Sequence, residues 1–133
     1  MGPSMKPERR FRQSVTQFLR DVYVWPINDN YQAGVPDHYY SGHANDLWAE
    51  YKYFPTDKDS FDLLKPASRP RLTSLQQHWL NRRHDEGRAV WVVVGFPSGG
   101  VILMNQEWME PVKVRGLLSR EQIAREIMLV CCK

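Results

Sequence analysis

The sequence has 133 residues, a formal net charge of +3, and 42% hydrophobic and 25% charged residues. This composition is ordinary for a globular protein and argues against disorder, and the length favours one domain. The longest apolar run, residues 89–94, is too short to cross a bilayer, so we expect a protein that does not associate with membranes.

The ends of the chain add two expectations. Residues 1–4 look like a cloning remnant, so we expect the domain to span residues 5–133. No secretory h-region opens the chain, and Cys131 and Cys132 are adjacent, a spacing that does not suit an ordinary disulfide. We therefore expect an intracellular, cytoplasmic protein.

The first half of the chain predicts one helix and three strands. Residues 7–20 carry apolar residues at helical spacing, with a proline in the first turn. Residues 22–26 are β-branched and aromatic and predict a short strand. The runs 35–40 and 47–54, separated by turn-forming residues 41–46, predict a hairpin. Residues 55–71 predict a long surface loop with one short turn near 61–64.

The second half begins and ends with helices. Thr73 to Gln76 is a capping-box pattern that opens a helix, which Gly87 ends and which turns Leu75, Trp79 and Leu80 inward. The apolar run 89–94 predicts a central strand buried on both faces, and a turn at 97–100 leads into a strand at 101–104. A second capping box, residues 119–122, opens a final helix with an inner side formed by Ile123, Ile127 and Val130.

These elements follow one another in the order α-β-β-β-α-β-β-α. Strands and helices in this order predict an α/β fold in which helices flank a mixed central sheet.

The predicted hairpin carries the residues that could support catalysis. Asp37 lies on its first arm, and alternation along the second arm places Glu50 and Lys52 on one face with Tyr51 pointing away. The two carboxylates and the backbone carbonyl of Tyr51 are hard oxygen ligands that suit Mg²⁺ or Mn²⁺. Such an ion activates water and offsets charge on a scissile phosphate, while a lysine orients or deprotonates the attacking water. Each motif alone is weak, because Glu-x-Lys is common on solvated strands and Pro-Asp is common in turns.

Taken together, Gly34-Val-Pro-Asp37, a hairpin and Glu50-Tyr-Lys52 resemble the PD-(D/E)XK nuclease superfamily, above all its VRR-NUC and archaeal Holliday-junction-resolvase branch. That branch has a glutamate on the first helix, which Glu8 matches. It also has a glutamine in the helix after the Glu-x-Lys strand, which Gln76 matches within Leu72-Thr-Ser-Leu-Gln76. The likeness runs from residue 8 to residue 103.

The resemblance implies a restriction-endonuclease-like fold and a Mg²⁺- or Mn²⁺-dependent endodeoxyribonuclease. The implied catalytic residues are Asp37, Glu50, Lys52 and Gln76, and the implied metal ligands are Glu8, Asp37, Glu50 and the carbonyl of Tyr51. Two of these residues also suit other roles, because Glu8 can stabilise the helix dipole and Gln76 can cap Thr73. His38 stands where the family usually has an aliphatic residue, so it is either an accessory group at the site or an ordinary strand histidine.

Basic residues are concentrated in the second half of the loop and in the following helix. We expect phosphate contacts from Lys65, Arg69, Arg71, Arg82 and Arg83, although solvated helix faces have the same composition. DNA is the expected partner, with RNA as an open alternative. The resemblance also implies a homodimer acting on branched DNA, and a small stand-alone nuclease of this type suits a phage or mobile element.

Two other interpretations remain open at this point. The chain could be a catalytically silent nuclease fold that binds nucleic acid or a protein partner. Alternatively, Asp37, Glu50 and Lys52 could form an ordinary salt-bridge network on a mixed sheet.

Overall fold

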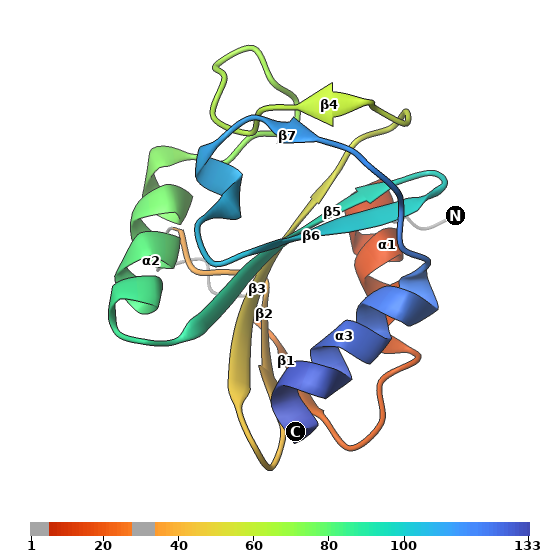
Figure 1. The fold of residues 1–133 in the computed structure, drawn as a ribbon, viewed down its shortest axis with the longest axis vertical. Coiled ribbons are helices and arrows are strands. Elements are labelled where there is room, and N and C mark those ends of the chain that lie inside the picture. The colour runs from red at the N-terminus through yellow and green to blue at the C-terminus, as the bar shows by residue number, and fades with distance from the viewer. Residues whose placement is uncertain (1–5, 28–33) are drawn as a thin grey trace, which may run out of the picture.

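The computed structural model describes residues 6–27 and 34–133 (Figure 1). Its helices and strands are, in chain order, α1 (Pro7–Thr16), β1 (Tyr23–Pro26), β2 (His38–Ser41), β3 (Asp46–Tyr53), β4 (Ser60–Phe61), α2 (Ser74–Asp85), β5 (Ala89–Phe96), β6 (Gly99–Met104), the 3₁₀ turn η1 (Glu107–Met109), β7 (Val112–Lys113) and α3 (Arg120–Cys132). Among the described residues, no helix is long and apolar enough to cross a membrane.

Five strands form the central sheet in the order β1-β2-β3-β5-β6. The β3–β5 pair is parallel and the other three pairs are antiparallel, so the sheet is mixed as predicted. The short strands β4 and β7 form a separate two-stranded sheet. Helices flank the central sheet (Figure 1), which confirms the predicted fold class.

The two faces of the sheet bury different clusters of apolar side chains. On one face, Tyr51 of β3 and Trp91 of β5 pack with residues of α1 and α3. On the other face, Val92 of β5 packs with Leu80 of α2 and with Trp108 of η1. Strand β5 is buried along nearly its whole length, as its continuous apolar run predicts. Each fully buried aliphatic side chain of this kind contributes about 1.5–3 kcal/mol to folding.

Both predicted capping boxes are present. The Thr73 side chain accepts a hydrogen bond from the N–H of Gln76 at the start of α2, and Ser119 does the same with Gln122 in α3. Gly87 follows α2 with φ +84°, the left-handed conformation expected of a residue that ends a helix.

Several predicted details are wrong. Helix α1 ends at Thr16, because the next residues form tighter i−3 hydrogen bonds and the chain turns at Asp21 with φ +61°. The loop at 55–71 contains β4, which pairs with β7 about 50 residues further along the chain. Because the pairing joins distant segments, no local sequence pattern predicts β4. The Leu75 residue, predicted to face the core, is 55% exposed.

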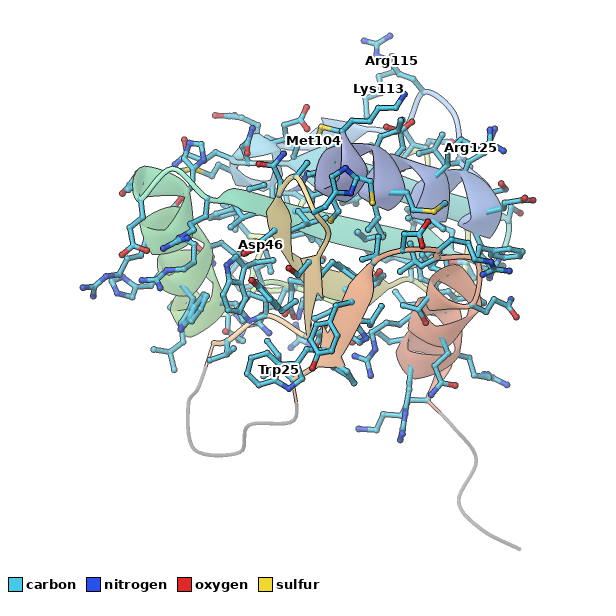
Figure 2. The ribbon with its side chains drawn as sticks, turned by 90° about the horizontal axis from the view of Figure 1, so that it is seen from below. Trp25, Asp46, Met104, Lys113, Arg115 and Arg125 are labelled. Carbon is cyan, nitrogen blue, oxygen red and sulfur yellow. The ribbon has the colours of Figure 1, made fainter. Side chains whose placement is uncertain are left out.

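Strand β2 is shorter than β3, and the difference shapes the sheet. Its pairing with β3 begins at His38, opposite Ala49, whereas β3 continues to Tyr53. The first arm of the hairpin therefore starts three residues later than predicted, partly because Pro36 has no N–H to donate to a neighbouring strand. At the outer edge of the sheet, Trp25 projects from β1 and is 50% exposed (Figure 2).

Candidate active site

The candidate site lies where β2 stops and β3 continues alone on that side. Asp37, the residue just before β2, accepts a hydrogen bond at 2.9 Å from the backbone N–H of Tyr51 to its Oδ2 atom. The carboxylate thus takes the place of a strand partner. The N–H and C=O of a strand residue point to the same side, so the Tyr51 carbonyl also points to the side of β3 that β2 leaves unpaired. The prediction that Asp37 lies on the first strand of the hairpin is wrong, because β2 begins at His38, but the Asp37 carboxylate still reaches β3.

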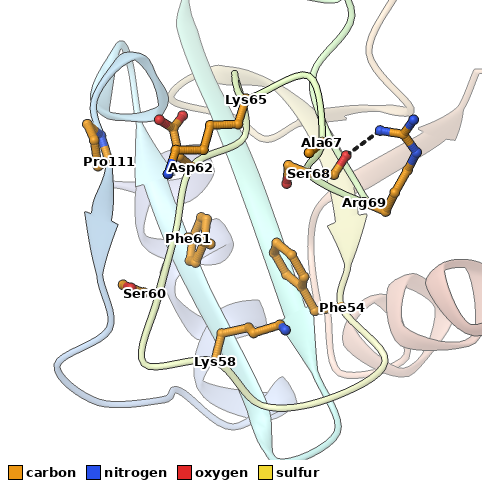
Figure 3. A pocket seen from close by; sticks show the side chains of 10 residues that line it. All are labelled: Phe54, Lys58, Ser60, Phe61, Asp62, Lys65, Ala67, Ser68, Arg69 and Pro111. Carbon is orange, nitrogen blue, oxygen red and sulfur yellow. Dashed lines mark hydrogen bonds between the residues drawn. The ribbon is translucent and has the colours of Figure 1, made fainter.

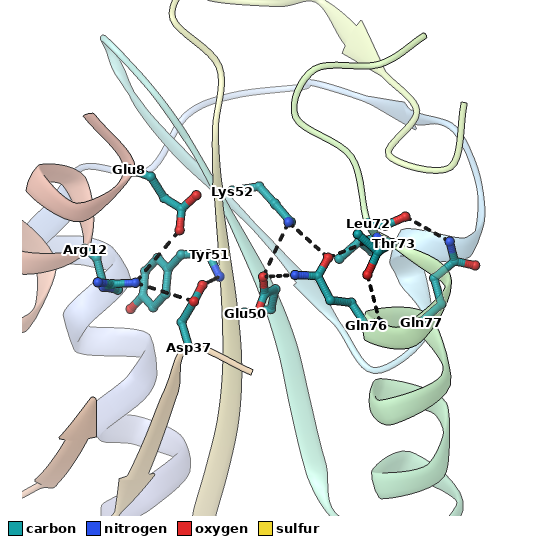
Figure 4. Close-up of polar contacts among 10 residues, drawn as sticks. All are labelled: Glu8, Arg12, Asp37, Glu50, Tyr51, Lys52, Leu72, Thr73, Gln76 and Gln77. Atoms are coloured by element: carbon teal, nitrogen blue, oxygen red, sulfur yellow. Dashed lines mark hydrogen bonds and ion pairs between the residues drawn. The ribbon is translucent and has the colours of Figure 1, made fainter. Parts of the chain in front are cut away.

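The side chains of Glu50 and Lys52 share the α2 side of β3, as strand alternation predicts. Both are nearly buried, with side-chain exposures of 4% and 11%, and Lys52 Nζ lies 3.4 Å from Glu50 Oε2. Gln76 completes a triangle (Figure 4). Its Oε1 accepts a hydrogen bond from Lys52 Nζ at 3.1 Å, and its Nε2 donates to Glu50 Oε2 at 2.9 Å.

Gln76 combines the two roles that the sequence left open. Its Oε1 also accepts a hydrogen bond at 3.0 Å from the backbone N–H of Thr73, so one amide caps α2 and contacts both Glu50 and Lys52. At Gly34, the segment that leads to Asp37 packs closely against the backbone of the first turn of α2. Its φ is +87°, and a Cβ atom at this position would lie 2.5 Å from the carbonyl oxygen of Leu75.

Helix α1 brings Glu8 and Arg12 to the site from the other side. Arg12 Nη1 lies 3.8 Å from Glu8 Oε1 and 3.5 Å from Asp37 Oδ1 (Figure 4). The guanidinium of Arg12 therefore lies between the carboxylates of Glu8 and Asp37 and contacts both. The sequence pattern indicated Glu8 but not Arg12, whose only local signal is its position one helical turn after Glu8.

All three carboxyl groups have raised pKa values. Burial is the largest cause for each of them. The charge of Asp37 further raises the pKa of Glu50 and of Glu8, while the hydrogen bond from Tyr51 N–H partly lowers that of Asp37. Since the ionised carboxylates repel one another in a poorly solvated place, an added cation would relieve an electrostatic cost.

The donor set fits a hard divalent cation. Asp37 and Glu50 supply carboxylate oxygens and Tyr51 a carbonyl oxygen, which are ligands that Mg²⁺ and Mn²⁺ accept. Within residues 6–27 and 34–133, no three His, Cys, Asp or Glu side chains gather closely enough to hold a metal ion by themselves. A metal bound here would thus use the carbonyl and water in addition to the two carboxylates, with Glu8 separated from Asp37 by Arg12.

His38 lies in the core. Its residue exposure is 5%, and its ring packs against Tyr40 and Tyr51, with centroids 5.5 Å and 5.7 Å away. Burial lowers its pKa to about 4, so the imidazole is neutral at pH 7. These contacts are on the α1 and α3 side of the sheet, opposite the side chains of Glu50 and Lys52.

Two of the expected phosphate-binding residues line a pocket of about 470 Å³ next to the site (Figure 3). Lys65 and Arg69 are at its rim, and Phe54 and Phe61 are among its buried aromatic residues. Phe54 follows Lys52 by two residues, so the pocket continues the face of β3 that carries the candidate catalytic residues. Lys58 joins the rim, although no sequence pattern indicated it.

The other expected basic residues lie outside this pocket. Arg71 is exposed shortly before α2, and Arg82 and Arg83 occupy the last turn of that helix. Arg83 lies over the ring of Trp79 at 4.7 Å and forms an ion pair with Glu86 at 3.0 Å, so part of its charge is already balanced.

Comparison with known proteins identifies the fold. No protein-family model matches the sequence, and no similar sequence was found among curated proteins. The structure is similar to that of Hjc from Archaeoglobus fulgidus, a Holliday junction resolvase from an archaeal hyperthermophile. The match has a TM-score of 0.55 at 13% sequence identity and covers 88% of this chain and 99% of that one. The chain therefore has the restriction-endonuclease-like fold of this resolvase.

Proposed function

We propose that the chain is a divalent-metal-dependent endonuclease that hydrolyses phosphodiester bonds in DNA, with a preference for branched substrates. One observation carries the proposal. Lys52 Nζ lies 3.4 Å from Glu50 Oε2 beside Asp37, where β3 extends beyond β2 and the backbone of Tyr51 has no β2 partner. This arrangement combines metal ligands with a cation that can act on water.

Each residue has a defined role in this proposal. Asp37, Glu50 and the carbonyl of Tyr51 would hold Mg²⁺ or Mn²⁺, and Glu8 would lie beyond Arg12, outside this set of ligands. Such an ion would supply an activated water and would offset negative charge on the scissile phosphate. Lys52 orients or deprotonates the attacking water, and Gln76 keeps Lys52 and Glu50 in place through its two hydrogen bonds.

The proposed substrate follows from the surface around the site. DNA would lie over the face of β3 that carries Glu50 and Lys52. Its backbone phosphates would be contacted by the basic residues Lys65, Arg69, Arg71, Arg82 and Arg83. The preference for branched DNA and a homodimeric assembly are proposed because the fold resembles that of a Holliday junction resolvase. Membership of the VRR-NUC branch and a phage or mobile-element setting remain predictions from the sequence.

The test is cleavage of a four-way junction, a flap, plain duplex, single-stranded DNA and RNA in Mg²⁺, Mn²⁺ or EDTA. Metal-dependent cleavage of the DNA junction should fall by at least about 100-fold in Lys52→Ala and Asp37→Asn, the scale of losing one preorganised catalytic group. Lys113→Ala and Asp46→Asn are matched controls, because they remove a lysine and an aspartate from outside the site. Both controls should cut at the wild-type rate.

Two results would point elsewhere. Tight junction binding by a folded protein that cuts nothing would favour a silent nuclease fold that only binds. Equal cleavage of all substrates would keep the nuclease and remove the preference for branched DNA.

A further inference from the structure

Arg12 is an unusual neighbour for a metal site. Its side chain is 16% exposed, and Nη1 lies within 3.8 Å of Glu8 Oε1 and 3.5 Å of Asp37 Oδ1. A guanidinium so placed occupies the space between two carboxylates that come from different elements (Figure 4).

An ordinary explanation of Arg12 is a surface ion pair with Glu8, since the two residues are one turn apart on α1. That explanation leaves out the contact with Asp37, which precedes β2 and lies closer to Arg12 Nη1, at 3.5 Å, than Glu8 does, at 3.8 Å. It also does not account for the low exposure of the Arg12 side chain, which is 16%. Ion pairs at the surface contribute about 0–1 kcal/mol and form between exposed side chains. The positive charge of Arg12 is directed into the site.

The charge balance shows what this cation does. With all groups ionised, the carboxylates of Glu8, Asp37 and Glu50 and the cations of Arg12 and Lys52 leave a net charge of −1. One divalent ion changes this to +1, which a single phosphodiester neutralises. A second divalent ion would bring the site to +3 before substrate binds, and like charges at these separations repel strongly where solvation is poor.

We propose that Arg12 is a built-in cation that stands where a second divalent ion would bind between Glu8 and Asp37, so that each chain takes one divalent ion. This inference rests on the proposed function. Arg12 acts through the carboxylates that it contacts. Glu8 then serves to hold Arg12 rather than to coordinate metal.

The experiment measures stoichiometry rather than activity. Mn²⁺ binding is followed by calorimetry and by the electron paramagnetic resonance signal of free Mn²⁺. The wild-type chain should bind one ion, and Arg12→Gln should bind two. Arg12→Lys, which keeps the charge, should bind one, as should Arg9→Gln, which removes an exposed arginine from the same helix. Glu8→Gln combined with Arg12→Gln should return to one ion, because the second ion needs the Glu8 carboxylate.

The outcomes separate the two proposals. A folded Arg12→Gln variant that still binds one ion, or a wild-type chain that binds two, overturns the role of Arg12 and leaves the nuclease proposal intact. A wild-type chain that binds no Mn²⁺ overturns both. Circular dichroism and thermal unfolding establish that each variant is folded, and the wild-type stoichiometry remains a test of the proposal if Arg12→Gln does not fold.

Discussion

The side-chain amide of Gln76 donates a 2.9 Å hydrogen bond to Oε2 of Glu50, although the two residues are 26 positions apart. The same amide caps the first turn of α2 through its contact with the N–H of Thr73. The start of a helix and a candidate catalytic carboxylate are therefore held by one side chain. This coupling has a direct consequence for mutagenesis.

Gln76→Ala should lower cleavage by about tenfold or more, because a hydrogen bond to a charged group contributes about 1.5–3 kcal/mol. The variant should also lose about 1 kcal/mol of stability through the lost cap. Gln122→Ala is the matched control, since Gln122 occupies the equivalent position in the capping box of α3. It should lose similar stability at unchanged activity. Equal cleavage rates in the two variants would show that Gln76 only caps its helix.

Gly34→Ala should destabilise the fold and reduce activity together. The substitution carries the cost of a positive φ, about 1–2 kcal/mol, and its Cβ would meet the Leu75 carbonyl oxygen at 2.5 Å. Relief of that contact must move either the segment before Asp37 or the start of α2. Urea unfolding and cleavage rates provide the two measurements.

Gly87→Ala separates the two causes in this prediction. Gly87 has a similar φ of +84°, but an added Cβ would meet nothing within 4 Å. It should show the conformational cost alone, at wild-type activity. If Gly34→Ala loses no more stability than Gly87→Ala, the close approach to α2 is not important.

Local signals in the sequence were enough to predict much of the fold and to select candidate residues that the structure brings together. The two capping boxes, the β2–β3 hairpin and the valine-rich β5 each depend on residues close together in the chain. Strand alternation also placed Glu50 and Lys52 on one face. The pairing of β4 with β7 could not be predicted, because it joins two-residue strands about 50 residues apart. The ion pair between Arg12 and Asp37 could not be predicted either, since it depends on how α1 packs beside β2.

Glu50→Gln should stabilise the metal-free protein at neutral pH. The pKa of Glu50 is raised well above 4.5, first by burial and then by Asp37, and these effects outweigh the attraction of Lys52. The stability that its protonation provides is therefore complete below pH 4.5 and is lost as pH rises through the folded-state pKa. In EDTA we expect the Tm of the variant to exceed that of the wild type by roughly 3–6 °C, the shift that about 1 kcal/mol produces in a domain of this size.

Asp46→Asn should change stability in the opposite direction. Hydrogen bonds from Tyr39 and Ser41 lower the pKa of Asp46, so its ionised form stabilises the fold above its ordinary pKa of 3.8. Thermal unfolding between pH 4 and 8, with and without Mn²⁺, distinguishes the two residues. Mn²⁺ should raise the Tm of the wild type and of Asp46→Asn but not that of Glu50→Gln. A Glu50→Gln protein less stable than the wild type in EDTA would mean that the ion pair with Lys52 dominates.

Lys65→Gln combined with Arg69→Gln should weaken DNA binding in a salt-dependent way. Each phosphate contact contributes about 0.9 to the slope of log Kobs against log salt, so the double variant should lose about 2 from that slope. The two side chains line the pocket that extends the face of β3 beyond Lys52. The control is Arg20→Gln combined with Arg125→Gln, which removes the same charge from exposed positions. Arg125 lies on α3 and Arg20 contacts that helix, which packs on the opposite face of the sheet. An identical decrease in both double variants would mean that net charge, rather than the pocket, determines affinity. A decrease confined to Lys65 and Arg69 would establish that the nucleic acid passes over this end of β3.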